Sequence, residues 1–330
     1  INSTISNNSA RNSGGGVFNS RNAAFTHVTV VQNRSESDGD GSGTGGGIYN
    51  PYAQFILNNS IVADNVTGSA QAGNEIAGYL SSASAHNLIG ADEYATDAGG
   101  LDDNEDNLFI TDNVDLRLGP LADNGGPTLT HALLGGSPAI DAGDSDLSIN
   151  EFGIPLAFDQ RGTNRISGAS VDIGAFELFD SDGDGVDDSI EDLGPNDGDG
   201  DADGIADSQQ SHVASVRTPA DGSYVTILAP TGTTLQEVAA LAAPSAGMTP
   251  SDANLYPFGF LSFQLTGIAV GATINVDLIP DTTTPVTQLV NTFQKFGPSP
   301  GNATPHEYQF LYDGTTGAEL LTDRLRLHFV

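Results

Sequence analysis

Residues 180–207 carry so much like charge that this stretch can fold only if cations neutralise it. It contains eleven Asp and one Glu, and it has no Lys or Arg. Carboxylates crowded in this way repel one another, and a segment of such composition stays disordered when it has no counterions. The spacing of these carboxylates is regular, however, and it is the spacing of a metal-binding loop.

Two loops of the pattern D-x-D-x-D-G-x-x-D follow one another here. A calcium loop draws oxygen ligands from positions 1, 3, 5, 7, 9 and 12, and glycine at position 6 makes the sharp turn. In the first loop Gly185 stands at position 6, and position 7 offers a main-chain carbonyl. The predicted Ca²⁺ ligands of this loop are Asp180, Asp182, Asp184, the carbonyl of Val186, Asp188 and Glu191.

The second loop repeats the pattern from position 1 to position 9, with Gly204 at position 6. Gln210 stands at position 12, so this loop lacks the bidentate carboxylate. Its predicted ligands are Asp199, Asp201, Asp203, the carbonyl of Ile205 and Asp207. An acidic, solvated linker is the alternative, but two loops in register are more specific than a single motif match.

An EF-hand needs a helix on each side of its loop, and the flanking sequence argues against both helices. Gly194 and Pro195 follow the first loop almost at once, and residues 171–176 before it predict a strand. The stretch instead resembles the calcium-binding thrombospondin type 3 repeat, a helix-free chain of such loops wrapped around ions. The resemblance implies a calcium-binding, Asp-rich linker over residues 179–210.

Two short motifs recur through residues 1–66. The first is a strand-forming run that ends in Asn, at 2–8, 27–33 and 59–65, and the second is Gly-Gly-Gly-x-x-Asn, at 14–19 and 45–50. Repetition at roughly 25 to 32 residues, with short strands and Gly or Asn turns, is typical of a solenoid. Asn tolerates a left-handed turn and can bond its amide to the Asn of the next coil. A β-sandwich of repetitive hairpins is the alternative.

Four phrases of the sequence resemble the choice-of-anchor Q proteins of bacterial surfaces. They are residues 119–134, 136–143, 159–162 and 171–177. The resemblance covers most of residues 1–178 and implies that they form a right-handed parallel β-helix. One departure is Gly135-Gly136, where the family usually has Pro-Gly.

Residues 211–330 change character and predict an antiparallel β-sandwich, because several strands are separated by Gly and Pro turns. Strands are expected at 224–228, 260–265, 273–278, 307–312 and 324–329. Phrases at 208–210, 256–259, 295–298 and 311–318 resemble the choice-of-anchor U domain, which commonly follows such calcium repeats. The predicted fold class is therefore all-β, with a β-helix, a calcium-binding linker and a β-sandwich.

The chain is strongly acidic, with a formal net charge of -33 and a pI near 4.1. Lys295 is its one lysine, so it lacks the basic clusters that bind nucleic acid or an anionic membrane. It has no cysteine, and metal ions can cross-link an exported chain that has no disulfides. No apolar run approaches the roughly 20 residues of a membrane span. Because the sequence opens at Ile1 within a repeat, we expect part of a longer secreted protein.

We predict no catalytic residue. The six histidines lack the spacing of a zinc site, and the arginines of residues 1–178 lack the neighbouring acidic cluster that a polysaccharide lyase needs. The nearest approach is Asp159-Gln-Arg161, and we interpret Arg161 as a structural residue paired with Asp141 or Asp172.

These observations favour a secreted, calcium-stabilised structural protein of the bacterial cell surface or extracellular matrix. An uncovered strand edge at each end invites pairing, which predicts head-to-tail self-association into a fibre or layer. The alternative is a longer chain that caps these ends itself. One alternative is an adhesin that binds surface polysaccharide, and another is a polysaccharide lyase or hydrolase, since β-helices host such enzymes. Calcium is expected to order the linker between two domains that fold without it.

Overall fold

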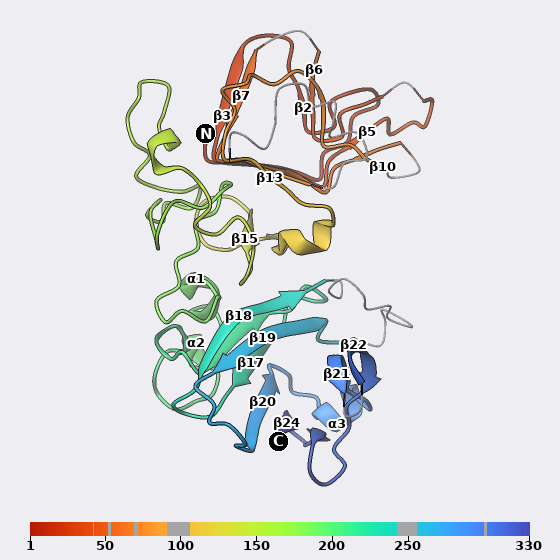
Figure 1. Cartoon of the computed structure of the whole chain (residues 1–330), viewed down its shortest axis with the longest axis vertical. Helices are drawn as coiled ribbons and strands as arrows, with labels where there is room; N and C mark the ends of the chain where they lie inside the picture. Colours follow the sequence, from red (N-terminus) through yellow and green to blue (C-terminus); the bar gives the residue numbers. More distant parts are fainter. Residues whose placement is uncertain (42, 52–53, 69–71, 91–105, 243–255, 300–301) are drawn as a thin grey trace. The chain divides into compact units, whose positions relative to one another are not determined.

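The computed structural model describes residues 1–41, 43–51, 54–68, 72–90, 106–242, 256–299 and 302–330. Strands make up 37% of the described residues and helices 7%, which confirms the all-β class. The chain divides into two compact units (Figure 1). The N-terminal unit comprises Ile1–Leu133 and Ser137–Phe179, and the C-terminal unit comprises Leu134–Gly136 and Asp180–Val330. Among the described helices, none is long and apolar enough to cross a membrane.

Parallel strand pairing dominates the N-terminal unit. Its largest sheet has the order β1 (Ser3–Ser6), β4 (Val28–Val31), β8 (Ile61–Ala63), β12 (Leu88–Ile89) and β13 (Leu108–Phe109). All four pairs in this sheet are parallel. The three predicted copies of the Asn-ended motif thus lie side by side, with Ser3 opposite Val28 and Thr29 opposite Ile61.

Three smaller sheets follow the same repetition (Figure 1). Two are parallel throughout: β2 (Val17–Phe18), β6 (Ile48–Asn50) and β11 (Ile76–Gly78), and the pair β3 (Ala23–Thr26) and β7 (Phe55–Asn58). In the third, β5 (Arg34–Ser35) pairs in parallel with β9 (Val66–Thr67), and β10 (Ala72–Gly73) pairs with β9 antiparallel.

The two glycine motifs lie against one another, and the approach is too close for side chains. The amide of Gly15 donates to the carbonyl of Gly45, and a Cβ on Gly15 would lie 2.3 Å from the carbonyl oxygen of Gly46. Only glycine can stand there, because real Cβ contacts do not come so near to main-chain atoms. The triple glycine is therefore a requirement of the stacking.

Asparagines form a ladder at the ends of the parallel strands. The side-chain amide of Asn8 donates to Oδ1 of Asn33 at 2.9 Å, and that of Asn33 donates to Oδ1 of Asn65 at 3.0 Å. Asn87 donates in the same way to Asn107 at 2.9 Å. The predicted bonding is thus confirmed from Asn8 to Asn33 and from Asn33 to Asn65, whereas the amide of Asn65 donates to Oε2 of Glu75 at 2.7 Å. This bonding satisfies buried polar groups that would otherwise lack a partner.

A hydrophobic core lies between these sheets. The rings of Phe25 and Phe55 meet edge to face, 4.8 Å apart. The buried members of the core are Val28, Val30, Ile48, Phe55, Leu57, Val62, Ile76, Leu80 and Ile89.

The rest of the N-terminal unit is less regular. It contains η3 (Asn113–Leu116), the antiparallel pair β14 (Leu118–Ala122) and β15 (Thr130–Leu133), and η4 (Ser145–Leu147). The strand predicted at 171–176 is wrong, because these buried residues form no strand. The amides of this segment have scattered acceptors: Glu177 accepts from the amide of Asp172 at 2.9 Å, and the carbonyl of Ala139 accepts from that of Ile173 at 2.9 Å. Gly174 turns the chain with φ of 108°.

The C-terminal unit contains antiparallel sheets (Figure 1). A five-stranded sheet has the order β16 (Val213–Arg217), β17 (Tyr224–Leu228), β20 (Ile274–Pro280), β24 (Leu325–Phe329) and β23 (Gly317–Leu320). Two further antiparallel pairs are β18 (Thr234–Leu241) with β19 (Phe260–Thr266), and β21 (Gln294–Ser299) with β22 (Asn302–Gln309). A single helical turn, α3 (Val286–Leu289), precedes β21.

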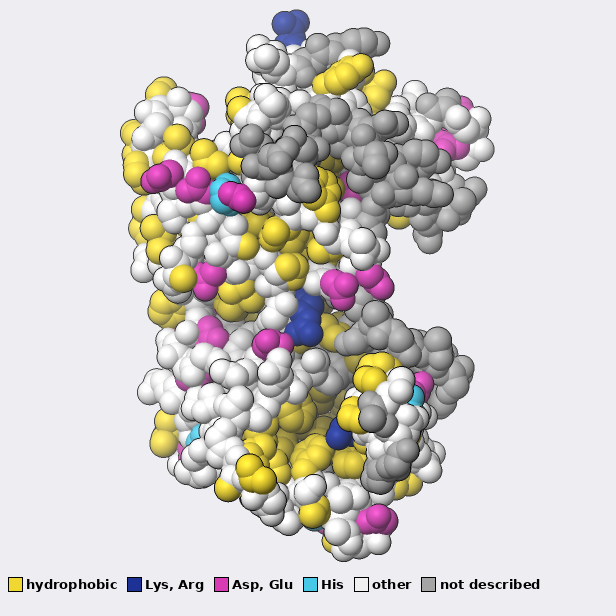
Figure 2. Space-filling model, in the orientation of Figure 1, with side chains coloured by type: hydrophobic (Ala, Val, Ile, Leu, Met, Phe, Trp, Pro, Cys, Tyr) yellow, Lys and Arg dark blue, Asp and Glu magenta, His cyan; other side chains and the backbone are white. Residues whose placement is uncertain are grey.

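The Asp-rich stretch belongs to the C-terminal unit. It forms only single turns, α1 (Asp188–Glu191), α2 (Pro195–Gly198) and η5 (Asp207–Gln209). Val186 from the first loop is buried in the same hydrophobic core as Val216, Ile227 and Val238 from the strands. Acidic side chains are spread over the visible face of the molecule, and Lys and Arg are sparse there (Figure 2).

Candidate metal centres

The first loop brings three carboxylates together. One carboxylate oxygen from each of Asp180, Asp182 and Asp184 lies within 4.8 Å of the other two. Main-chain amides orient the first of them, because Gly183 and Gly185 donate to the two oxygens of Asp180 at 2.7 and 2.8 Å. Both glycines have φ in the left-handed region, 84° and 98°, where side chains are strained. The glycines therefore let the backbone curl around the carboxylate at position 1.

The two loops share one pattern of amide bonds. In each loop the carboxylate at position 3 accepts from the amide of position 5, and the carboxylate at position 5 accepts from the amide of position 7. These bonds are Asp184 N to Asp182 Oδ1 (3.2 Å), Val186 N to Asp184 Oδ1 (2.7 Å), Asp203 N to Asp201 Oδ1 (3.2 Å) and Ile205 N to Asp203 Oδ1 (2.9 Å). Because the acidic residues are two positions apart, the main-chain amide two residues further along the loop can donate to each carboxylate and orient it.

The other predicted ligands of the first loop lie outside the triad. Asp188 accepts from the amide and the hydroxyl of Ser181 at 2.8 and 2.6 Å. Glu191 is fully buried, and its Oε1 accepts from the amide of Ser215 at 3.1 Å. Val186 lies in the hydrophobic core, which fixes the main chain that carries the predicted carbonyl ligand.

Two carboxyl groups of the first loop, those of Asp184 and Glu191, are fully buried and that of Asp182 is partly buried, without a counter-charge. Burial, reinforced by the charges of neighbouring carboxylates, raises the pKa of Glu191 to about 11 and that of Asp182 to about 7. Burial and then the charge of Asp182 raise the pKa of Asp184, which is 0% exposed. Oδ2 of Asp182, Oδ2 of Asp184 and Oε2 of Glu191 have no hydrogen-bond partner within the described residues. Buried carboxyl groups in this state must stay neutral or bind a cation.

The second loop forms its own triad, in which the ligand oxygens of Asp199, Asp201 and Asp207 lie within 4.8 Å of one another. Burial raises the pKa of Asp207 to about 6. The predicted ligand Asp203 lies outside the triad, and its Oδ1 accepts from Nε2 of Gln210 at 3.3 Å. Nε2 of Gln210 also lies 3.3 Å from the carbonyl oxygen of Ile205. Two predicted ligand oxygens therefore face an amide donor at position 12.

Ser215 connects the two loops, and sequence reasoning missed it. Its amide donates to Glu191 of the first loop, and its hydroxyl donates to Oδ2 of Asp207 in the second loop at 2.5 Å. The same hydroxyl lies 2.7 Å from the hydroxyl of Thr226 on the neighbouring strand β17. A serine in a run of strand residues carries no signal of such a role, which depends on how β16 packs against the loops.

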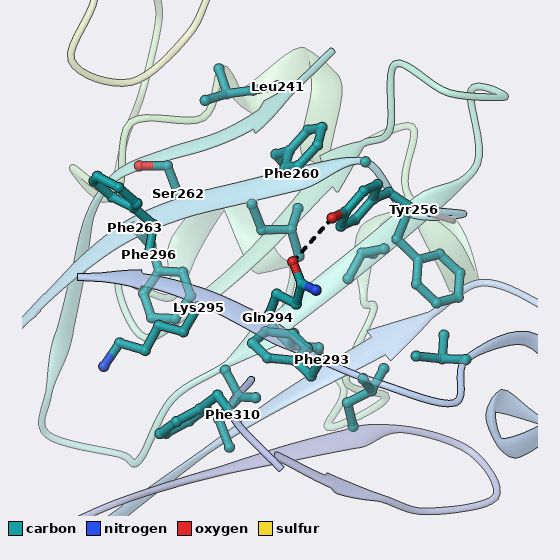
Figure 3. A pocket seen from close by; sticks show the side chains of 18 of the residues that line it. Leu241, Tyr256, Phe260, Ser262, Phe263, Phe293, Gln294, Lys295, Phe296 and Phe310 are labelled. Carbon is teal, nitrogen blue, oxygen red and sulfur yellow. Dashed lines mark hydrogen bonds between the residues drawn. The ribbon is translucent and has the colours of Figure 1, made fainter. Parts of the chain in front are cut away.

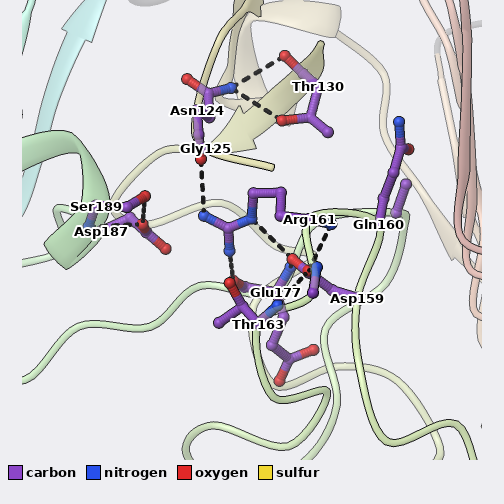
Figure 4. A network of polar contacts seen from close by, with 12 residues as sticks. Asn124, Gly125, Thr130, Asp159, Gln160, Arg161, Thr163, Glu177, Asp187 and Ser189 are labelled. Carbon is purple, nitrogen blue, oxygen red and sulfur yellow. Dashed lines mark hydrogen bonds and ion pairs between the residues drawn. The ribbon is translucent and has the colours of Figure 1, made fainter. Parts of the chain in front are cut away.

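Arg161, the nearest approach to a catalytic pattern, is buried in a network of the N-terminal unit (Figure 4). Its acidic partner is Asp159, with Nε 2.8 Å from Oδ2, and the predicted pairing with Asp141 or Asp172 is wrong. Asp159 is in place because its Oδ1 accepts from the amide of Arg161 at 2.7 Å, which closes a tight turn. The guanidinium also lies 3.6 Å from the ring centroid of Phe176. These contacts hold the guanidinium between the turn and the ring of Phe176.

A second buried ion pair, Arg165 with Glu177, lies in the same unit at 3.5 Å. Arg165 also donates to Oδ1 of Asn2 at 2.8 Å and so links residues near the end of the unit to the start of its first strand.

Comparison of the chain with family models, curated proteins and solved structures found no match.

Proposed function

We propose that this chain is a calcium-stabilised structural protein of the bacterial cell surface or extracellular matrix, and that each Asp loop holds one Ca²⁺. One observation carries the metal proposal: Asp184 and Glu191 are fully buried, and each has a carboxylate oxygen without a partner in the described structure. The positive charge of a cation bound at the triad would balance the negative charge of these carboxylates, so that they could ionise in the folded protein.

The donor set favours calcium over other metals. Every candidate ligand in both triads is a carboxylate oxygen, and the chain has no cysteine. Zinc prefers nitrogen and sulfur ligands, and magnesium demands a small octahedral site and retains water. Calcium accepts six to eight oxygens in flexible geometry, which suits a loop that offers carboxylates and a main-chain carbonyl.

The structural part of the proposal is supported by the parallel ladders of the N-terminal unit. We infer that residues 1–178 form a short right-handed parallel β-helix, held by stacked glycines and asparagines, and that residues 211–330 form a β-sandwich. Self-association would bring together chains of net charge -33, which repel one another. Bound calcium lowers this charge, so the proposed head-to-tail assembly should depend on calcium, and light scattering can measure that dependence.

Calcium titration by isothermal calorimetry tests the proposal. The wild-type chain should bind two Ca²⁺, and Asp184→Asn should lose one of them, because the first triad loses a charged ligand. Asp281→Asn is the matched control, since Asp281 is exposed and lies outside both loops. Failure of the wild-type chain to bind calcium in the range of about 10⁻⁴ to 10⁻³ M, where extracellular modules bind, would reject the proposal.

A further inference from the structure

A cavity of about 640 Å³ lies within the C-terminal unit, and neither Asp loop lines it. Its walls come from the β18–β19 pair, from one face of the five-stranded sheet and from the β21–β22 pair (Figure 3). In the described structure these three sheets share no strand pairing, and the cavity lies between the side chains that they contribute. The volume falls in the range of roughly 300 to 1,000 Å³ that small-molecule sites occupy.

The lining is mainly aromatic. Seven of the 15 phenylalanines of the chain line this cavity, and none of the seven is fully buried. They are Phe258, Phe260, Phe263, Phe293, Phe296, Phe310 and Phe329. Hydrophobic side chains gather around a hollow on the visible face of this unit (Figure 2). An apolar ligand that covers these partly exposed rings would remove their apolar surface from water, and this burial favours binding.

The single lysine of the chain also lines the cavity. Nζ of Lys295 lies 5.0 Å from the ring centroid of Phe310 and 4.9 Å from that of Phe329. Burial lowers its pKa, and no acidic residue contributes to that shift. The chain has 43 acidic residues, yet Lys295 forms no ion pair within the part of the chain that the structure describes. A half-buried ammonium without an anion is complementary to an acidic group on a ligand.

Few other polar groups reach the cavity. Tyr256 and Gln294 point toward one another, and the tyrosine hydroxyl donates to Oε1 of Gln294 at 3.1 Å (Figure 3). Glu307 also lies near the hydroxyl of Tyr256, since burial and then the charge of Glu307 raise the pKa of that tyrosine. Lys295 is the cationic side chain among the described residues that line the cavity. A largely apolar space with one cation selects for a ligand that is apolar along its length and acidic at one end.

We propose that this cavity binds a small anionic amphiphile, with its apolar tail among the phenylalanines and its acidic head paired with Lys295. The site is separate from the calcium loops, so the proposal does not depend on which metal those loops hold.

The test compares decane-1-sulfonate, an anion at every pH used, with the uncharged decan-1-ol, by isothermal calorimetry on the full chain. Decane-1-sulfonate should bind one per chain and about 15-fold more tightly than octane-1-sulfonate, since each buried methylene is worth about fourfold. Lys295→Met should weaken the sulfonate about tenfold or more and leave decan-1-ol unchanged. Arg217→Met, a change at an exposed arginine of the same unit that does not line the cavity, should affect neither ligand.

Two results would overturn the proposal. The first is no binding of decane-1-sulfonate to the folded wild-type chain. The second is equal affinity for the sulfonate in the wild-type chain, Lys295→Met and Arg217→Met. Should Lys295→Met fail to fold, Lys295→Arg takes its place. This variant keeps the charge and should keep the preference for the sulfonate over the alcohol. Equal affinity of the wild-type chain for the sulfonate and the alcohol would then contradict the role of Lys295.

Discussion

At the scale of single residues, the Asp-rich stretch is defined by carboxyl groups that the chain itself does not neutralise. Asp184 and Glu191 are fully buried, and the charges nearest to them are those of other carboxylates. Asp159 and Glu177 of the N-terminal unit, which are also buried, have arginine partners instead. Among the described residues, the buried carboxylate oxygens without a hydrogen-bond partner all lie in the first loop, on Asp182, Asp184 and Glu191. This is the residue-level argument for a metal ion there.

The raised pKa values predict how the calcium-free protein responds to pH. The pKa of Asp182 is raised to about 7 and that of Asp207 to about 6, from 3.8. A carboxyl group with a raised pKa in the folded state favours folding while it is protonated, and this contribution is lost as the pH rises through the folded-state pKa. Urea unfolding in EDTA should therefore show the C-terminal unit losing stability between about pH 4 and pH 7.

Saturating calcium should reverse that trend, because the metal binds the ionised carboxylates and competes with protons. The same urea series, repeated with calcium, should show stability that does not fall over this pH range. A stability that is independent of pH in EDTA would contradict the burial of these groups.

Gln210→Glu should tighten calcium binding at the second loop by about tenfold, since it places a carboxylate at position 12 beside Asp203 and the carbonyl of Ile205. In the calcium-free protein the same change should be destabilising, because it adds a like charge there. A chelator-competition titration measures the affinity. Gln209→Glu is the control, with the same charge change at an exposed neighbour. Equal calcium affinity in the two variants would contradict the predicted role of position 12.

At the scale of elements, the repeated motifs could be predicted from the sequence because successive copies of each motif lie side by side in the fold. Asn33 bonds to Asn65, and Gly15 lies against Gly46. The failed prediction at 171–176 has a physical cause, because the amides of this buried segment bond to several different partners and not to one neighbouring strand. Asp172 donates to Glu177, Ile173 to the carbonyl of Ala139 and Gly174 to the carbonyl of Asn59. Ser215 was missed because its role comes from packing between distant segments.

The Asn ladder predicts a large loss of stability at its centre. Asn65 is fully buried, and its side-chain amide donates to the carbonyls of Val30 and Ala63 and to Oε2 of Glu75. Asn65→Ala removes these three bonds and also the side-chain oxygen that accepts from Asn33, so it should cost about 3 kcal/mol or more of the free energy of unfolding. Asn8→Ala removes an exposed member of the same ladder and should cost less than about 1 kcal/mol. Urea unfolding measures both, and equal losses would contradict the ladder's structural role.

At the scale of the whole molecule, the calcium loops are integrated into the C-terminal unit. Val186 packs into its core, the amide of Val238 donates to the carbonyl of Asp184 at 3.0 Å, and the hydroxyl of Tyr224 donates to the carbonyl of Ile190 at 3.0 Å. Loss of calcium should therefore weaken the strands as well as the loops. The sequence could not predict this, because the acidic stretch gives no sign of the strands against which it packs.

Scanning calorimetry of the wild-type chain with calcium and with EDTA tests the central claim most directly. At about 1 mM calcium, the concentration range of extracellular sites, the unfolding transition of the C-terminal unit should lie well above its position in EDTA. The transition of the N-terminal unit should stay in place, and Asp184→Asn should show a smaller calcium-dependent shift than Asp281→Asn. Identical thermograms in calcium and in EDTA would contradict the account.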